Sequence, residues 1–332
     1  MHYVGIDLHK RDLVVCVMDD DGATSKPVRM SCQDVPLVRE FFENVGPFRA
    51  VIEASSSYRW LYDLLSPMGE VILAHPLKLR AIVSARAKTD KLDSAMLAKL
   101  LRVELIPPAY VPPAHYQVLR DLTRARARLS CQATATKNEL HAQLRRANVH
   151  PPFKNVFCKT GRAWLAKLDL PFGGDIVRDE LIRRLAHYEC EMDRLDGRLK
   201  PLARSFPEIA ALANLHGIAT YSALLIVAEI GEPERFSNPR QVGAYAGLTA
   251  RVRQSGMQDR HGHISKQGSS WLRWILVQAA MKLVRRDVKL RNFYTRIRKR
   301  SGAKVARVAT ARKLAEICWI RLKRWHKERA AA

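Results

Sequence analysis

Four carboxylates in the first hundred residues have the types and spacing expected of a metal-dependent active site. Asp7 lies in an apolar stretch, YVGIDL at residues 3–8, where a charged side chain that faces a core needs a partner. Glu53 ends a second apolar stretch, and Asp90 and Asp93 stand three apart in a helical pattern, hence on one face. If the two strands are neighbours and the helix crosses their ends, the four charges meet in one place.

Such a cluster repels itself unless a cation neutralises it. Carboxylates offer only oxygen ligands, which favour Mg²⁺, with Mn²⁺ as the alternative. Two ions about 4 Å apart suit phosphodiester chemistry. Each acid also has a structural explanation: Asp7 as a turn residue, Glu53 as a cap, and the helical pair as acids that favour a helix N-terminus. The order strand-Asp, strand-Glu, helix-Asp-x-x-Asp favours one shared site.

A serine far along the chain is the candidate nucleophile. Ser255 precedes Gly256 in RVRQSGMQDRHGHISKQGSSWLR, residues 251–273, which we interpret as a basic loop between apolar helices. Its cations are Arg251, Arg253, Arg260, Lys266 and Arg273. A serine among cations could attack a phosphate while the charges stabilise the pentavalent state, although serine needs a base or a metal. The alternative is a loop whose serines only bind phosphates through hydrogen bonds.

Two further stretches indicate nucleic-acid binding. Gly217 and Ile218 form a turn between two short predicted helices, an arrangement that resembles a helix-hairpin-helix, whose turn amides can meet a phosphate. A packed helical hairpin without a ligand is the alternative. Farther on, basic residues that include Arg285 and Arg286 are interleaved with aromatic ones. Such a high density of basic residues favours binding to a nucleic-acid backbone over a helix face that is only solvated.

The hydrophobic pattern predicts an α/β fold followed by an α fold. Three strands, then alternating helices and strands, indicate a mixed sheet with flanking helices, and prolines at 107–113 end this part. Long, charged segments that are nearly free of proline, 118–147 and 176–204, predict extended helices that could pair. A mainly helical C-terminal part follows. We therefore expect domains at 1–106, 115–205 (helical coiled coil and connector) and 208–330.

Charge divides the chain of 332 residues unevenly. The net charge is +25, yet residues 1–100 hold 13 basic and 13 acidic side chains, whereas residues 201–332 hold 26 and 8. A basic rear half predicts a polyanion, most often nucleic acid, as partner, with a membrane surface less favoured. Six separated cysteines, no secretory signal and no long apolar run predict a cytoplasmic, nucleoid-associated chain with no membrane span.

The sequence resembles the DEDD-type insertion-sequence transposases, with the Piv-type DNA invertases as relatives. The matching segments are YVGIDLHK, VIEASSSY, KTDKLDSAMLAKLL, GIATYSALLIVAEIGEPERFSNPRQVGAYAGLT and RQSGMQDRHGHISKQGSSWLR. Ser56 and Ala250 stand where the family often has Gly and Pro, and Ala219 departs from the hairpin pattern. None of these departures falls on a catalytic position.

The resemblance implies a RuvC-like domain of the RNase H type, a coiled-coil stretch and a serine-bearing transposase domain. The family's acids fall on Asp7, Glu53, Asp90 and Asp93, and its essential serine on Ser255. It implies a recombinase in which that serine forms a covalent phosphoserine link to DNA, an acidic cluster that binds Mg²⁺, a homo-oligomer (dimer or tetramer) and a guide RNA. The alternatives are a metal-only Holliday-junction-type endonuclease and a non-catalytic nucleic-acid-binding protein.

Overall fold

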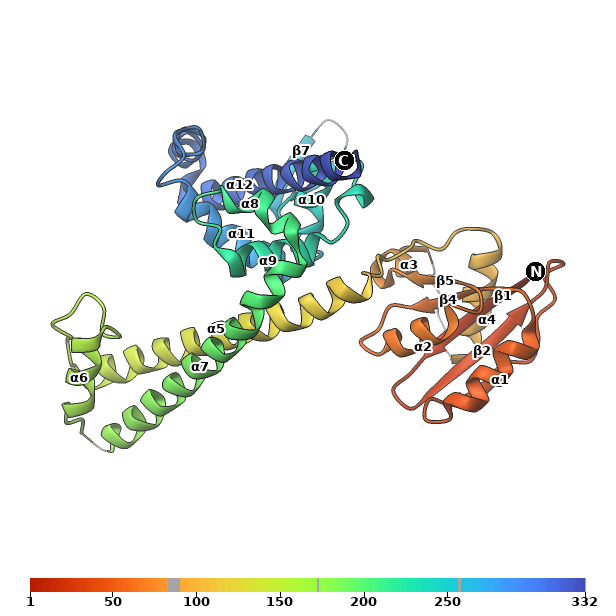
Figure 1. Ribbon diagram of the computed structural model, residues 1–332, viewed down its shortest axis with the longest axis horizontal. Helices are drawn as coiled ribbons and strands as arrows, with labels where there is room; N and C mark the ends of the chain where they lie inside the picture. The colour runs from red at the N-terminus through yellow and green to blue at the C-terminus, as the bar shows by residue number, and fades with distance from the viewer. Residues whose placement is uncertain (83–89, 172, 256–257, 332) are drawn as a thin grey trace. The chain divides into compact units, whose positions relative to one another are not determined.

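The computed structural model describes residues 1–82, 90–171, 173–255 and 258–331. The chain divides into two compact units, Met1–Val111 and Pro112–Ala332. The first is a sheet with helices, and the second consists mainly of helices with a two-stranded hairpin (Figure 1). The mixed α/β architecture expected from the sequence is therefore observed, whereas the finer boundaries at 106, 115, 205 and 208 stay a prediction.

A five-stranded mixed sheet forms the centre of the first unit, with the order β3-β2-β1-β4-β5. Strands β1 and β2 are antiparallel, as are β2 and β3, while β1, β4 and β5 run parallel. The strands are β1 (His2–Leu8), β2 (Asp12–Met18), β3 (Val28–Ser31), β4 (Phe48–Glu53) and β5 (Glu70–Ala74); the helices are α1 (Val35–Val45), α2 (Tyr58–Leu65), α3 (Pro76–Ile82) and α4 (Asp90–Arg102).

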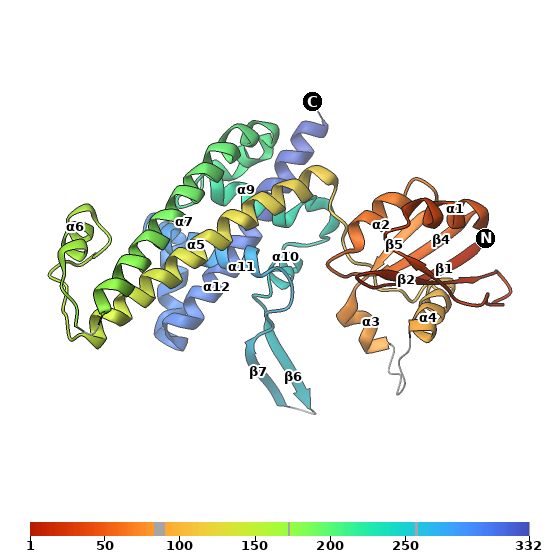
Figure 2. The ribbon, with the colours of Figure 1, turned by 90° about the horizontal axis from the view of Figure 1, so that it is seen from below.

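The two faces of the sheet carry different helices. Helices α1 and α2 lie on one side and α3 and α4 on the other (Figure 2). Side chains alternate along a strand, so Val4 and Ile6 pack with Phe42 and Leu61 under α1 and α2. Gly5 and Asp7 then belong to the opposite face, the one that α4 covers.

The contact between α4 and the sheet is made backbone to backbone at Gly5. A Cβ at this position would collide with the Ser94 carbonyl oxygen and lie 2.6 Å from the Ala98 amide nitrogen. Ser94 is fully buried in this contact. Glycine is required here because the helix sits where a side chain would otherwise project.

Two long helices dominate the first part of the second unit. Helices α5 (Ala114–Arg146) and α7 (Gly174–Leu202) lie side by side, with α6 (Lys159–Lys167) at one end of the pair (Figure 1). These are the helices expected at 118–147 and 176–204. No helix within the described residues is long and apolar enough to cross a bilayer.

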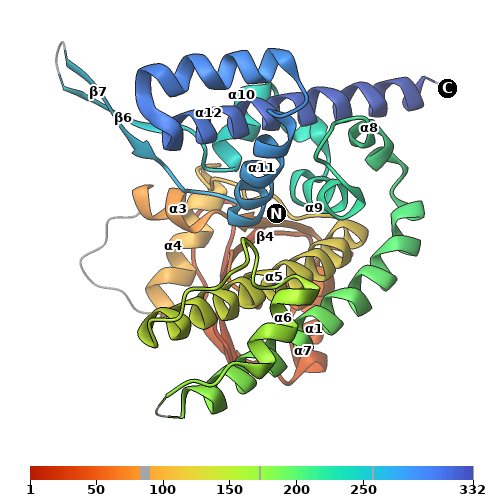
Figure 3. The ribbon, with the colours of Figure 1, turned by 90° about the vertical axis from the view of Figure 1, so that its left-hand side faces the viewer.

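A buried helix, α9 (Thr220–Ile230), is the centre of the second unit. Every residue from Ala223 to Ile230 is buried, because the helix packs against both α5 and α11 (Ser270–Leu283; Figure 3). Its Glu229 is fully buried and is held by Arg124 of α5 at 2.6 Å, Nε to Oε1. Ser269, which caps α11, donates a hydrogen bond to the same carboxylate at 2.8 Å. One buried charge therefore joins three helices.

The remaining elements surround this centre. Short 3-10 helices lie at Ala203–Ser205, Pro207–Ile209 and Pro233–Arg235, and the other helices are α8 (Ala210–Ala213), α10 (Pro239–Tyr245) and α12 (Val288–Ala330). Helix α12 bends sharply at Gly302, where φ is +83°.

The segment interpreted as a basic loop contains a two-stranded hairpin. Strands β6 (Ala250–Ser255) and β7 (Gln258–Ile264) pair antiparallel, which was not expected from the sequence. The alternation of Arg251, Val252 and Arg253 is a strand pattern that the glycines and serines obscured.

The substitution Gly5→Ala tests the contact that holds α4. We expect the added methyl group to force the Ser94 carbonyl away and to lower the opening free energy of α4 amides by about 1–3 kcal/mol. Hydrogen exchange followed by mass spectrometry measures this. Gly197→Ala in α7, where an added Cβ meets open space, is the control and should stabilise its helix by about 0.5–1 kcal/mol. Unchanged exchange in α4 of the Gly5 variant would contradict the proposed constraint.

Candidate active site

Asp7 and Glu53 lie beside each other at the carboxyl ends of two parallel strands. The pairing of β1 with β4 ends with Ile6 opposite Ile52, so the next residues along each strand are the two acids. Asp7 shares the face of Gly5, and Glu53 that of Val51, which packs with Leu97 of α4. Both acids therefore project from the face that α4 covers.

Asp93 joins them from α4. It directly precedes Ser94, whose carbonyl lies over Gly5, so the close contact of helix and strand fixes its position. Asp7, Glu53 and Asp93 line one small cavity of about 40 Å³, together with Leu79, Arg80, Met96, Leu97 and Leu100. The structure thus brings together three of the four acids singled out in the sequence.

The fourth acid is placed by its backbone alone. Asp90 is the first residue of α4, and its side chain lies outside the described residues. It precedes Asp93 by three positions, which puts the two Cα atoms on the same side of the helix. Its membership of the cluster stays a prediction.

Two basic side chains accompany the acids and were not singled out in the sequence. His9 Nε2 lies 3.1 Å from Asp7 Oδ2, and Arg80 of α3 lines the cavity. The Asp7 side chain is 16% exposed and lines the cavity. The i, i+2 spacing of Asp7 and His9 was a usable signal, whereas nothing in the sequence relates Arg80 to this place.

The donor chemistry of this cavity fits a hard divalent cation. The carboxylates of Asp7, Glu53 and Asp93 line it and offer oxygen ligands, which suit Mg²⁺ or Mn²⁺; the Arg80 guanidinium and the Met96 thioether line it as well. In the part of the chain whose side chains are described, no group of three or more His, Cys, Asp or Glu residues forms a closed ligand set. Binding of an ion would therefore require the side chains of these carboxylates to move closer to one another than they are in this structure.

Ser255 occupies the tip of the hairpin in the second unit. It is the last residue of β6 and pairs with Gln258, so two residues separate the strands. Arg253 and Arg260 stand at paired positions two residues closer to the base. The side chains of 252–261, these among them, lie outside the described residues. The backbone places the predicted nucleophile at the end of a strand and not in the expected loop.

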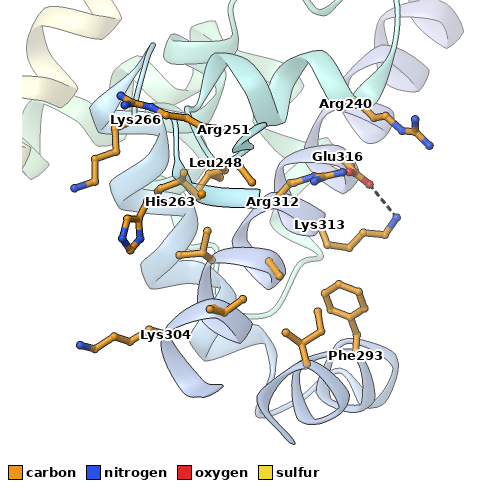
Figure 4. Close-up of a pocket in the computed structure, with 17 residues that line it drawn as sticks. Arg240, Leu248, Arg251, His263, Lys266, Phe293, Lys304, Arg312, Lys313 and Glu316 are labelled. Carbon is orange, nitrogen blue, oxygen red and sulfur yellow. Dashed lines mark hydrogen bonds and ion pairs between the residues drawn. The ribbon is translucent and has the colours of Figure 1, made fainter. Parts of the chain in front are cut away.

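The other predicted nucleic-acid contacts separate into two groups. Arg251 and Lys266 line a groove of about 1040 Å³ at the base of the hairpin (Figure 4), and Arg285 and Arg286 are exposed beyond α11. Arg273, in contrast, donates a hydrogen bond to the Ala246 carbonyl at 2.9 Å, and burial lowers its pKa. Arg273 thus holds the connection to the hairpin.

The turn at Gly217 packs against α11. Gly217 has φ +87°, and a Cβ there would lie 2.6 Å from Lys282 Cβ, so the position demands glycine. Ile218 is 5% exposed and belongs to the core of the second unit. The Ile218 side chain is therefore not available to a phosphate, and binding of a phosphate by this turn stays a prediction.

Comparison with known proteins agrees with these observations. Residues 4–149 match a transposase domain of the DEDD IS110 type, and residues 209–295 match the transposase IS116/IS110/IS902 family. A probable family 20 transposase of Pseudomonas aeruginosa is 30% identical over 309 residues, covering 86% of this chain and 87% of that one.

More distant relatives extend over similar lengths. The transposase for insertion sequence element IS1111A of Coxiella burnetii is 24% identical over 99% of this chain and 92% of its own. The pilin gene-inverting protein of Moraxella bovis is 23% identical over 84% of this chain and 82% of its own. The match with the DEDD domain covers Asp7, Glu53, Asp90 and Asp93, and the second match covers Ser255.

Titration with Mn²⁺ tests whether the three acids bind an ion together. We expect one saturable class of sites in the full chain by calorimetry, with affinity lowered at least about 10-fold by Asp93→Asn, because one anionic oxygen ligand is lost. Asp63→Asn is the matched control, since Asp63 lies in the same unit, pairs with Arg59 and does not line the cavity. Equal affinities of the two variants would exclude this cavity as the site.

Proposed function

The chain belongs to the IS116/IS110/IS902 family of transposases, and we propose that it cuts and rejoins insertion-element DNA with Ser255 as nucleophile and the cavity of Asp7, Glu53 and Asp93 as a Mg²⁺ site. DNA recombination follows from membership of the family. The observation that carries the mechanism is the convergence of these acids from β1, β4 and α4, which are separated by up to 86 positions in the chain.

The acids supply the part of the mechanism that needs an ion. Asp7, Glu53 and Asp93 would hold it, with Asp90 as a further ligand. The chemistry that a bound divalent ion contributes is Lewis-acid polarisation of phosphoryl oxygens. His9 holds the Asp7 carboxylate at 3.1 Å and so orients one ligand, while Arg80 adds a positive charge at the cavity for a phosphate that approaches it.

The serine supplies the covalent step. As the bond from Ser255 Oγ to phosphorus forms, a phosphorus–oxygen bond of the DNA backbone breaks, the hydroxyl proton passes to a base, and the released sugar oxygen takes up a proton. Attack by the hydroxyl of a second strand reverses these steps and frees the serine. The exchange conserves the number of phosphodiester bonds, so it requires no nucleotide cofactor.

Neighbouring cations suit this step. Arg253 and Arg260 are paired in the hairpin, two positions along their strands from the pair of Ser255 with Gln258, and guanidinium groups are suited to binding a phosphate. The acids and the serine belong to different units, and the family resemblance implies that they can come from different copies in a dimer or tetramer. A guide RNA belongs to the same proposal, as does action in the nucleoid.

Trapping of a protein–DNA adduct tests the role of Ser255. Incubated with Mg²⁺ and DNA that carries the ends of the element, the wild-type chain is expected to give a product that migrates as protein plus strand in a denaturing gel. Ser255→Ala removes the nucleophile and should lower strand exchange at least about 1000-fold, with no adduct. Ser270→Ala, an exposed serine of the same unit, is the control and should retain both.

Two outcomes would favour the alternatives, and a third experiment tests whether different copies supply the acids and the serine. Cleavage by Ser255→Ala that leaves free ends would indicate a metal-only endonuclease. Binding without any cleavage by the wild-type chain would indicate a non-catalytic protein. Restoration of activity when Ser255→Ala is mixed with Glu53→Gln would show that one copy supplies the acids and another the serine.

A further inference from the structure

The groove at the base of the hairpin in the second unit has no role in the function proposed above. It measures about 1040 Å³, just above the range of about 300–1,000 Å³ for ligand sites. Its walls come from α10, the two hairpin strands and both arms of α12 (Figure 4). The lining side chains that carry the inference all belong to residues that the structure describes.

The charge of the groove selects for an anion. Six of its lining residues are basic and one is acidic: Arg240, Arg251, Lys266, Lys304, Arg312 and Lys313, against Glu316. Glu316 holds Lys313 at 2.9 Å and Arg312 at 3.6 Å. Lys266 and Lys304 stand on one side of the groove and Arg240 and Lys313 on the other (Figure 4). A ligand between them meets positive charge from both sides.

The interior of the groove is apolar. Leu248 and Ile264 come from the hairpin side, whereas Phe293, Ile297 and Val308 come from α12. Phe293 is half-buried, and the Arg296 guanidinium lies 5.7 Å from its ring. An aromatic ring beside cations is the combination that stacks a base and neutralises its phosphate.

The bend of α12 creates this combination. Phe293 and Ile297 precede Gly302, while Lys304, Val305 and Val308 follow it. In a straight helix the residues before and after Gly302 would lie at different heights along one axis. The bend at Gly302, where φ is +83°, lets both arms of α12 line the same groove. The side chain of Arg312 packs 3.1 Å from where a Cβ on Gly243 would lie, which fixes the second arm to α10.

We propose that this groove binds an unstacked nucleotide of single-stranded DNA, with the base against Phe293 and the adjoining phosphates on Lys266 and Lys304. The inference rests on the proposed function, because it takes the DNA that this transposase acts on as the polymer. A paired duplex cannot supply a free base face, since both faces are stacked. The groove is therefore expected to prefer DNA strands that have separated from their complement.

The position of the groove suits a strand held at the hairpin tip. Arg251 is four residues from Ser255 along β6, about 13 Å at the rise of a strand. At about 3.4 Å per stacked nucleotide, this corresponds to roughly four nucleotides. A strand joined to Ser255 could reach the groove with a base that lies a few positions from the junction, and would be held there while it awaits its new partner.

Binding of labelled oligonucleotides to the full-length chain tests the proposal. We expect a fluorescent single strand of DNA, and a duplex with one unpaired nucleotide, to bind at least about 5-fold more tightly than the same duplex fully paired. Phe293→Ala should remove this preference and leave the affinity for the paired duplex unchanged. Phe293→Leu keeps the apolar packing but not the stacking, so it should lose the preference while retaining the wild-type thermal midpoint.

Matched variants separate stacking from charge. Tyr294→Ala changes a neighbouring aromatic ring that does not line the groove and should preserve the preference. Lys304→Ala should reduce the salt dependence of single-strand binding by about one charge, whereas Lys299→Ala, on the same helix but outside the groove, should reduce it less. The proposal would be overturned if both Phe293 variants kept the wild-type preference for single-stranded over paired DNA. It would also be overturned if they lost affinity for the paired duplex as much as for the single strand.

Two arms distinguish this inference from neighbouring ones. An RNA strand of the same sequence that binds at least about 10-fold more tightly than the DNA would overturn the choice of DNA as ligand. The adduct with Ser255 is measured separately: if Phe293→Ala forms it normally and binds single strands normally, the groove proposal fails while the proposed function stands. A wild-type chain that prefers single strands but forms no adduct would contradict the proposed function and leave the groove as a single-strand site.

Discussion

The missing side chain at Gly5 lets α4 rest directly on β1, and the placement of the acids depends on that contact. With the Ser94 carbonyl over Gly5, the preceding residue, Asp93, is brought to the end of the strand. The parallel register of β1 and β4 places Asp7 and Glu53 at the same level. Both the strand register and the contact of α4 are needed for the three acids to line one cavity, because the sheet supplies Asp7 and Glu53 and the helix supplies Asp93.

A different constraint organises the second unit. The carboxylate of Glu229 lies in the core, where an isolated charge would be costly, and the Arg124 guanidinium and the Ser269 hydroxyl both bind it. These contacts fix α5 and the start of α11 against α9. A hydrogen bond from Arg273 to the Ala246 carbonyl also joins the segments on either side of the hairpin.

Much of this could be predicted from the sequence because the relevant signals are local. Short apolar stretches located β1, β2 and β4, and a leucine pattern located α4, so the order of acids on strands and helix was readable. The convergence of Asp7, Glu53 and Asp93 was expected, whereas the contact that enforces it was not, since Gly5 looks like any strand glycine until the helix is placed. The hydrogen bond from Arg273 to the Ala246 carbonyl could not be predicted, because it is a tertiary contact; binding of nucleic acid by Arg273 stays a prediction. The groove at α12 was also invisible, for it depends on a bend that brings distant residues together.

Crystals grown with Mn²⁺ and measured near the manganese absorption edge would test the central claim most directly. We expect an anomalous peak within coordination distance of carboxylate oxygens from Asp7, Glu53 and Asp93, in the cavity beside Leu97, and its loss in Asp93→Asn crystals grown under the same conditions. A peak bound elsewhere, or none at this cavity at saturating Mn²⁺, would contradict the claim that these three acids form a metal site.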